Sequence, residues 1–237
     1  MVQLLRDRTD AQTPVAWDTE TTALEPRDAA LVGIGCCWGS DPEAVAYIPI
    51  GHSQGQCLDL QMVLDSLRPI LESDRHPKAL QNAKFDRAVL RHQGITLAGV
   101  VFDPMLASYI LDSEGTYNLT YLSQKYLGIL AQSYKDLVPK GKTIAEVDIA
   151  SVADYCGMDV HTTFRLVGEL RSALQQVGDR LHTLLTEVEQ PLEFVLETME
   201  YWGIRIDTHY LTTFSKQLET DLDNIAQQAY QAAGGEP

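Results

Sequence analysis

The sequence predicts an α/β fold with a mixed β-sheet flanked by helices, and three observations lead to this prediction. Three β-prone runs separated by short turns lie between residues 15 and 50, as in an antiparallel meander. After residue 60, short apolar runs alternate with segments of helical periodicity, which is typical of parallel strands connected through helices. The last 60 or so residues show helical periodicity alone, so we expect a helical extension at the C-terminal end.

The strands of the meander are expected at residues 15–17, 30–38 and 44–50, and the first of them should end at Asp18. Apolar residues then recur at helical spacing from Leu60 to Leu71. The remaining elements are expected as a strand at 79–81 running into a helix that stops near Gly94, a strand and helix at 100–111, an amphipathic helix at 118–128, a loop at 135–148 and a helix at 149–176.

A change in composition follows residue 176, and we expect one domain over residues 1–176 and a second unit over residues 177–237. The second unit has two amphipathic stretches, which are too little to make a core alone, so it resembles the beginning of another domain. The alternative is that these helices fold back on the first domain. Their apolar positions are Val188, Leu192, Val195, Leu196, Met199, Trp202, Leu211, Phe214, Leu218, Leu222 and Ile225.

Composition limits the classes of function. With 45% hydrophobic and 22% charged residues, the 237-residue chain is typical of a globular protein. No apolar run reaches the length of a membrane span, and the opening residues lack the apolar stretch of a signal peptide, so we expect no membrane partner and a cytoplasmic location. A net charge of -15 argues against a general nucleic-acid coating protein and predicts weak, salt-sensitive binding to long DNA.

The cysteines and glycines carry no recognisable cofactor motif. Cys36, Cys37, Cys57 and Cys156 form no CxxC pair, so we interpret them as small thiols, mostly buried. The segment from Gly33 to Gly35 is not a dinucleotide fingerprint and is interpreted as part of a strand or turn.

Two acidic residues stand side by side in the stretch VAWDTETTALEP. A strand would direct Asp18 and Glu20 to the same face, where two like charges are unfavourable unless a cation lies between them. The stretch therefore predicts either a cation site or a solvated strand end.

Two further segments offer side chains of the same chemistry. Asp86 lies at the beginning of a predicted helix, and Tyr155 and Asp159 are four residues apart on another, which places them on one helix face. Four carboxylates converging with a tyrosine would suit two Mg²⁺ or Mn²⁺ ions, which activate water in phosphodiester hydrolysis. Each residue alone has a plainer explanation: a solvated strand end, a favourable charge at a helix N-terminus, or an exposed helix pair.

Three basic residues follow the second segment at near-helical spacing. Lys84, Arg87 and Arg91 are candidates for phosphate contacts, and a solvated helix face is an equally good interpretation.

The order and context of the three segments add to this chemistry. DTETTALEP, QNAKFDRAVL and YCGMD resemble the three exonuclease motifs of the DEDD superfamily, in the subgroup with tyrosine in the third motif. The resemblance is strongest to the 3'-5' proofreading domain of bacterial family A DNA polymerases, the DNA polymerase I family, from about residue 15 to residue 174. Residues 187–207 resemble the beginning of the polymerase domain of that family.

This resemblance implies an RNase H-like fold and a set of roles. Asp18, Glu20 and Asp159 would hold the first divalent metal, Asp18 would bridge to a second near Asp86, and Tyr155 would hold the attacking water. The positions implied to contact the substrate are Thr19, Leu24, Asn82 and Phe85. Phe85 stands where the family often has tyrosine, and YCGMDVH departs from its usual YAAEDAD, but no implied metal ligand is lost.

The implied function is a metal-dependent 3'-5' exodeoxyribonuclease that proofreads within a DNA polymerase. Its substrate would be a single-stranded or frayed DNA 3' end, its products deoxynucleoside 5'-monophosphates, and its partner a polymerase domain that this chain lacks. We therefore expect a fragment or truncated product without polymerase activity of its own. The alternatives are a non-catalytic module that holds a DNA end or braces a polymerase, and an RNase D-like exoribonuclease.

Overall fold

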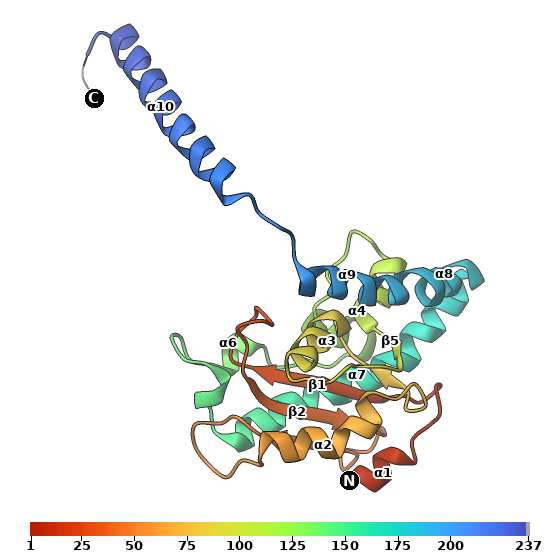
Figure 1. The fold of residues 1–237 in the computed structure, drawn as a ribbon. Coiled ribbons are helices and arrows are strands. Elements are labelled where there is room, and N and C mark those ends of the chain that lie inside the picture. Colours follow the sequence, from red (N-terminus) through yellow and green to blue (C-terminus); the bar gives the residue numbers. More distant parts are fainter. Residues whose placement is uncertain (236–237) are drawn as a thin grey trace. The chain divides into compact units, whose positions relative to one another are not determined.

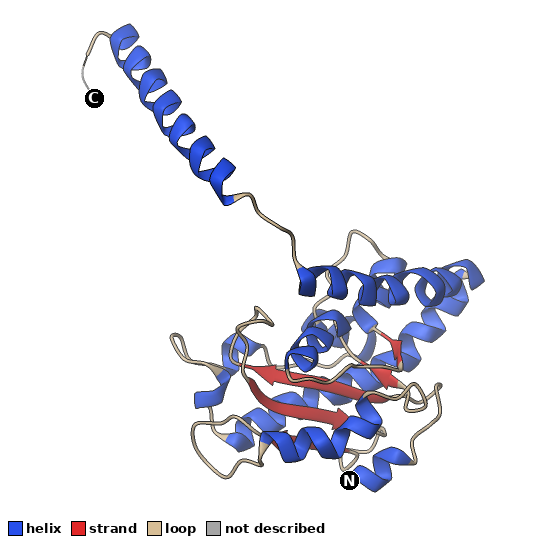
Figure 2. Ribbon diagram, viewed as in Figure 1, coloured by secondary structure: helices blue, strands red, loops and turns tan. Residues whose placement is uncertain are grey.

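The computed structural model describes residues 1–235, and the chain divides into two compact units, Met1–Tyr201 and Trp202–Pro237. The first unit contains a β-sheet with helices on both of its faces (Figure 1). Figure 2 shows that strands are confined to this unit among the described residues and that helices make up most of the rest.

Within the described residues, the sheet has five strands in the order β3-β2-β1-β4-β5. β1 pairs antiparallel with β2, and β2 with β3, whereas β1–β4 and β4–β5 are parallel. The predicted mixed sheet, a meander followed by parallel strands, is therefore confirmed. The strands are β1 (Val15–Thr21), β2 (Leu31–Cys37), β3 (Val45–Pro49), β4 (Lys78–Ala79) and β5 (Val100–Phe102).

Strand β1 is longer than the sequence predicted. It continues past Asp18 to Thr21, because its polar second half still pairs with β2, from Asp18 opposite Gly35 to Thr21 opposite Leu31. The expected end at Asp18 was wrong, because β1 is central in the sheet and its polar residues remain paired with β2. Asp18 and Glu20 accordingly share one face of an actual strand, as predicted.

The helices follow the predicted periodicity closely in the first unit. Gly94, with a φ of +75°, lies just after α3 where the helix was expected to stop. The helices are α1 (Val2–Arg6), α2 (Leu60–Leu71), α3 (Ala83–His92), α4 (Pro104–Leu111), α5 (Leu119–Leu122), α6 (Tyr134–Leu137), α7 (Ile149–Val177), α8 (Asp179–Leu184), α9 (Gln190–Trp202) and α10 (Thr208–Ala233).

Three local predictions need correction. Helix α1 was not predicted, and the expected loop at 135–148 contains part of α6 and a 3₁₀ turn (Ile144–Glu146). Capping boxes at Ser133 and Thr143 explain these two short turns, because each side chain satisfies amide groups that a loop would leave to water. The helix expected at 118–128 is α5 followed by a π-helical turn (Ser123–Leu127).

Apolar cores lie on both faces of the sheet. On one face, Trp17 of β1 packs with Leu64 and Leu67 of α2 and Leu90 of α3. On the other face, Ala16 of β1 packs against α7. Full burial of a large apolar side chain contributes about 1.5–3 kcal/mol, so these contacts fix α3 and α7 against the sheet. Both helices carry predicted site residues.

The second unit consists of α10 and the segment before it. One side of α10 carries an exposed apolar series, including Leu211, Phe214 and Leu218. The predicted domain boundary after residue 176 stays a prediction, as does the assignment of the C-terminal part to a polymerase domain. None of the helices over residues 1–235 combines the length and the apolar character required to cross a bilayer.

Candidate active site

Strand β1 places two acids on the face of the sheet that α7 covers. Asp18 lies opposite Gly35 of β2, and Glu20 lies opposite Gly33. Asp18 is half-buried, and Glu20 is buried, with 6% of its surface exposed. Glycine at these two positions of β2 leaves room for the side chains of Cys156 and Tyr47. A Cβ at Gly35 would lie 2.4 Å from Cys156 Sγ, and a Cβ at Gly33 would lie 2.1 Å from the Tyr47 hydroxyl.

Helix α7 brings the third predicted segment to the same place. Asp148 begins the helix by accepting a hydrogen bond from the Ser151 amide at 2.9 Å. One turn further, Tyr155 and Asp159 lie on one face of the helix, and the interaction of the Tyr155 hydroxyl with the Asp159 carboxylate lowers the pKa of that acid. The thiol of Cys156 lies 3.8 Å from Asp18 Oδ2, so α7 contributes a third side chain that the sequence did not single out.

Helix α3 supplies the remaining acid. Asp86 Oδ1 accepts hydrogen bonds from the amide and the hydroxyl of Thr19, at 2.9 and 2.7 Å. The Thr19 amide is available because β4 pairs with β1 only at Val15 and Ala16, so the two parallel strands separate before Thr19. This opening lies at the carboxyl ends of the strands, where ligands bind in open α/β sheets.

Asp103 organises this opening, although the sequence analysis did not identify it. It is fully buried and accepts hydrogen bonds from the amides of Asn82 and Ala83 at the start of α3. It also accepts from the Met105 amide as the cap of α4. An aspartate directly before a proline that begins a helix was the signal that could have found it.

The acids perturb one another electrostatically. Burial and then the charge of Asp18 raise the pKa of Asp159 to about 8, and burial raises the pKa of Asp18 itself to about 7. The pKa values of Glu20 and Asp86 are raised well above their ordinary range by burial, and Asp18 is the largest charge acting on each. We call Asp18, Glu20, Asp86 and Asp159 the carboxylate cluster. Like-charged neighbours of this kind favour a bound cation.

The donor set fits a hard divalent ion. Within the described residues, oxygen atoms of Asp18 and Glu20 and the sulfur of Cys156 lie within 4.8 Å of one another. Glu20 Oε1 is buried and has no hydrogen-bond partner, which is unusual for a buried carboxylate oxygen. Asp86 and Asp159 lie outside this closest group but act electrostatically on it. Carboxylate oxygens are the ligands that Mg²⁺ and Mn²⁺ prefer.

The predicted substrate-contacting residues lie around the same opening. Leu24, in the loop after β1, is 92% exposed, although a leucine of a globular protein is most often buried. Asn82 begins α3 with a φ of +61°, in the left-handed region that asparagine tolerates. Phe85 is half-buried and packs against the first apolar core, and Thr19 holds Asp86. Their contacts with a substrate stay a prediction.

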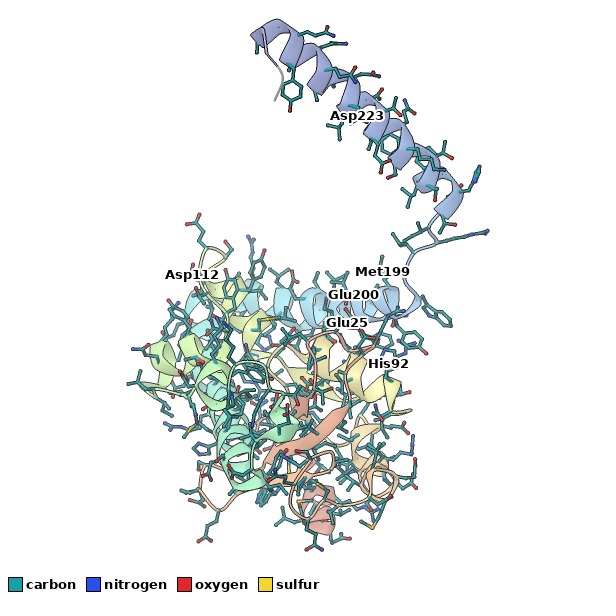
Figure 3. All side chains as sticks on the ribbon, turned by 90° about the vertical axis from the view of Figure 1, so that its left-hand side faces the viewer. Glu25, His92, Asp112, Met199, Glu200 and Asp223 are labelled. Carbon is teal, nitrogen blue, oxygen red and sulfur yellow. The ribbon has the colours of Figure 1, made fainter. Side chains whose placement is uncertain are left out.

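The loop that carries Leu24 is attached to α9. Arg27 donates through Nη2 to the backbone carbonyl oxygens of Glu200 and Tyr201, at 2.6 and 2.5 Å. Glu25, Arg27, His92 and Glu200 line a cavity of about 400 Å³, and Figure 3 labels Glu25, His92 and Glu200 in this region. The last turn of α9 therefore supports the loop from outside the carboxylate cluster.

The three basic residues of α3 contact α9 rather than solvent alone. Arg87 makes a bidentate pair with Glu193, both bonds 2.9 Å long, and both side chains are buried. Arg91 pairs with Glu197 at 2.8 Å, and Lys84 pairs with Glu200 at 2.5 Å. We call these three pairs the α3–α9 interface. Both interpretations offered for the basic residues were wrong for Arg87, whose guanidinium is buried and paired.

The family of the chain can now be assigned. The model of the 3'-5' exonuclease family of A-type DNA polymerases matches residues 2–175, nearly three quarters of the chain. The chain belongs to this family. The match includes the carboxylate cluster, so the resemblance found in the three motifs is confirmed.

Curated relatives extend the similarity beyond that domain. The chain is 52% identical to DNA polymerase I of Synechocystis sp. over 236 residues, covering 99% of this chain and 24% of the relative. DNA polymerase I of Chloroflexus aurantiacus is 35% identical, with 93% and 23% covered. The chain thus spans about a quarter of the length of the curated relatives that it matches.

Solved structures share the fold. The POL domain of Pol1 from M. smegmatis, in complex with DNA primer-template and dNTP, matches 100% of this chain and 36% of its own, with a TM-score of 0.77 and 20% identity. Brucella melitensis NrnC matches 86% of this chain and 94% of its own, with a TM-score of 0.59 and 22% identity. With the sheet topology, these matches confirm the RNase H-like fold.

Proposed function

We propose that this 3'-5' exonuclease domain removes nucleotides from the 3' ends of single-stranded or frayed DNA by two-metal hydrolysis, as the proofreading part of a DNA polymerase I. The products are deoxynucleoside 5'-monophosphates. The observation that carries the proposal is the convergence of four acids from β1, α3 and α7, with a buried oxygen of Glu20 left unpartnered.

The cluster supports the metal assignment through its charge and its donor atoms. Asp18, Glu20, Asp86 and Asp159 would hold two Mg²⁺ or Mn²⁺ ions. Bound ions of this kind supply Lewis acidity and neutralise the charge that develops on the oxygens of a phosphodiester. A relative in fold, Brucella melitensis NrnC, has been solved with bound Mg²⁺, which is consistent with the proposal.

The chain's own residues would orient the reactants. The Tyr155 hydroxyl stays protonated, because burial and the neighbouring Asp159 carboxylate raise its pKa further, so its oxygen can accept a hydrogen bond from a water molecule while its O–H faces Asp159. Thr19 fixes the Asp86 carboxylate through two hydrogen bonds, so the Asp86 side chain is held in one rotamer before substrate binds. Leu24 offers an exposed apolar surface on which the terminal base can pack.

The biological setting is proposed from the relatives. Because the matched relatives are DNA polymerase I and the chain spans about a quarter of them, the natural partner of this domain is a polymerase domain on the same chain. That domain would deliver the frayed 3' end. Our proposal requires no basic surface on this chain, which fits its net charge of -15.

Degradation of a 5'-labelled single-stranded DNA oligomer, at low salt with Mg²⁺, Mn²⁺ or EDTA, tests the proposal. Asp159→Ala removes a predicted ligand, and Asp154→Ala is the matched control, because Asp154 is exposed on the same helix. We expect a ladder shortening from the 3' end, abolished by EDTA, reduced at least about a hundredfold in Asp159→Ala and unchanged in Asp154→Ala.

Three results would contradict the proposal. A ladder of equal intensity in Asp159→Ala would show that the cluster is not the catalytic site. No degradation by the folded chain, even when it is joined to the polymerase part of its Synechocystis relative, would indicate a non-catalytic module. An RNA oligomer of the same sequence, degraded faster than the DNA, would replace the DNA substrate by RNA.

A further inference from the structure

We propose that Cys156 adds a sulfur ligand to the carboxylate cluster, so that the site also binds thiophilic divalent ions such as Zn²⁺ and Cd²⁺ through Asp18, Glu20 and Cys156. This inference rests on the proposed function, since it concerns the same acids. It adds a ligand, Cys156, to which the resemblance assigns no role.

The three ligand atoms lie close enough together to share one ion. Cys156 Sγ lies 3.8 Å from Asp18 Oδ2, and the ligand atoms of Asp18, Glu20 and Cys156 all lie within 4.8 Å of one another. Zinc binds sulfur at about 2.3 Å and carboxylate oxygen at about 2.0–2.2 Å, so ligands of one ion lie within about 4.5 Å of one another. The three side chains therefore need only small adjustments to share an ion.

The thiol of Cys156 occupies an enclosed position beside the acids. Cys156 is fully buried, and β2 accommodates its sulfur with a glycine, because a Cβ at residue 35 would lie 2.4 Å from it. Val160 of α7 lies beside the same glycine, 3.0 Å from that Cβ position. The sulfur is thus buried next to the acids and is not a mobile thiol on the protein surface.

Glu20 is 6% exposed, and its Oε1 has no hydrogen-bond partner among the described residues. An unpaired carboxylate oxygen in such a place costs free energy unless an ion satisfies it. Glu20 contributes a carboxylate oxygen to the same group as the sulfur, so an ion bound there would contact both residues.

The chemistry of the ligands determines which ions bind more tightly when Cys156 takes part. Thiolate is a soft ligand that favours zinc-like ions, and it contributes little to Mg²⁺, which prefers oxygen. Three protein ligands and one water complete a tetrahedral site. On binding, the metal–sulfur bond replaces the S–H bond, the proton passes to the buffer, and no atom is oxidised. Because Asp18 and Glu20 would serve both kinds of ion, Zn²⁺ or Cd²⁺ should displace Mg²⁺ or Mn²⁺.

The test is a Cd²⁺ titration of the intact chain, followed by the ultraviolet charge-transfer absorption of a cadmium–thiolate bond and by calorimetry. The variants are Cys156→Ala and Cys156→Ser, the latter to preserve volume. Cys57→Ala is the control, because Cys57 is the half-buried cysteine of the chain and does not belong to the group. Circular dichroism verifies that each variant is folded.

We expect the absorption band in the unmodified chain and in Cys57→Ala, and its loss in both Cys156 variants. We also expect the ratio of Cd²⁺ to Mn²⁺ affinity to fall at least about tenfold in those variants. A band that persists without Cys156 would overturn the inference. Mn²⁺ binding without any cadmium–thiolate band would overturn it while leaving the proposed function standing, and a folded chain that binds neither ion would contradict both.

Discussion

Helix α3 takes part in two regions of opposite electrostatic character. At its first turn, Asp86 joins the carboxylate cluster, where four acids face one another without a cationic side chain among their hydrogen-bond partners in the described structure. On its α9 side, Arg87 and Arg91 meet Glu193 and Glu197 in the α3–α9 interface. The same helix thus carries unpaired like charges and closely paired opposite charges.

This difference distinguishes residues placed to bind a ligand, in the carboxylate cluster, from residues that stabilise the fold, in the α3–α9 interface. Paired charges at the α3–α9 interface need nothing further and fix α3 in place. The cluster gathers charges that the protein alone does not balance, and the raised pKa values of Asp18 and Asp159 record that imbalance. Helix α3, fixed by its pairs with α9, therefore holds Asp86 beside acids whose like charges destabilise the metal-free protein.

The largest effect on stability is expected from breaking the buried pair of the α3–α9 interface. Glu193→Ala leaves the buried Arg87 guanidinium without its bidentate partner, so the free energy of unfolding should fall by about 3–5 kcal/mol. Urea denaturation followed by circular dichroism measures this loss. Asp112→Ala, which breaks the exposed pair with Lys125, is the control and should cost about 1 kcal/mol or less. Equal losses of unfolding free energy in both variants would show that the buried Arg87–Glu193 pair stabilises the fold no more than the exposed Lys125–Asp112 pair.

Asp103→Ala tests the link from the fold to the cluster. It leaves the amides of Asn82, Ala83 and Met105 without an acceptor, so we expect a loss of about 2 kcal/mol of stability. Nuclease activity measured well below the unfolding temperature should fall as well, since the start of α3 positions Asp86. Full activity in this variant would show that Asp86 does not depend on that capping.

A pH series in EDTA tests the cluster alone. The folded pKa values of Asp18 and Asp159, about 7 and about 8, lie above the ordinary aspartate value of about 3.9. The folded state therefore binds more protons between pH ~4 and pH ~8, and this contribution to stability is complete below that window and lost as the pH rises through it.

Asp18→Asn should remove much of this dependence. In EDTA at pH 8 we expect the variant to melt at a higher temperature than the unmodified chain, with a smaller difference at pH 5. Thermal unfolding across the series measures both curves, with Asp154→Asn as the exposed control. A lower melting temperature of Asp18→Asn at pH 8 would mean that the metal-free cluster stabilises the fold.

The smallest effect is expected at the exposed end of the α3–α9 interface. Lys84 is 35% exposed in its pair with Glu200, so Lys84→Ala should cost less than about 1 kcal/mol. If Lys84 does not contact phosphate, the salt dependence of single-stranded DNA binding should stay the same. A reduction of the salt slope by about 1 would instead assign Lys84 a phosphate contact.

The sequence predicted the architecture where the pattern was local. β-Prone runs and short turns identified β1 to β3, and helical periodicity identified α2, α3 and α7. It failed where tertiary pairing overrides local preference: the polar residues after Asp18 remain in β1 because β2 pairs with them. The turns at residues 134–146 depend on side-chain caps that were not considered.

The sequence predicted the acids of the candidate site but not the residues that position or adjoin them. Motif order identified Asp18, Asp86 and their neighbours, whereas Asp103 and Cys156 act through contacts between distant segments. The α3–α9 interface has a signal in the sequence. Bases at residues 84, 87 and 91 and acids at residues 193, 197 and 200 share the three- and four-residue spacing of one helix face.

The central claim is that unbalanced acids on β1, α3 and α7 exist to hold divalent cations. Calorimetric titration of the EDTA-treated chain with Mn²⁺, beside Asp18→Ala and Asp154→Ala, tests it most directly. We expect saturable binding by the unmodified chain and by Asp154→Ala, and loss of this binding in Asp18→Ala. Mn²⁺ binding that is unchanged by Asp18→Ala, with the variant folded, would contradict it.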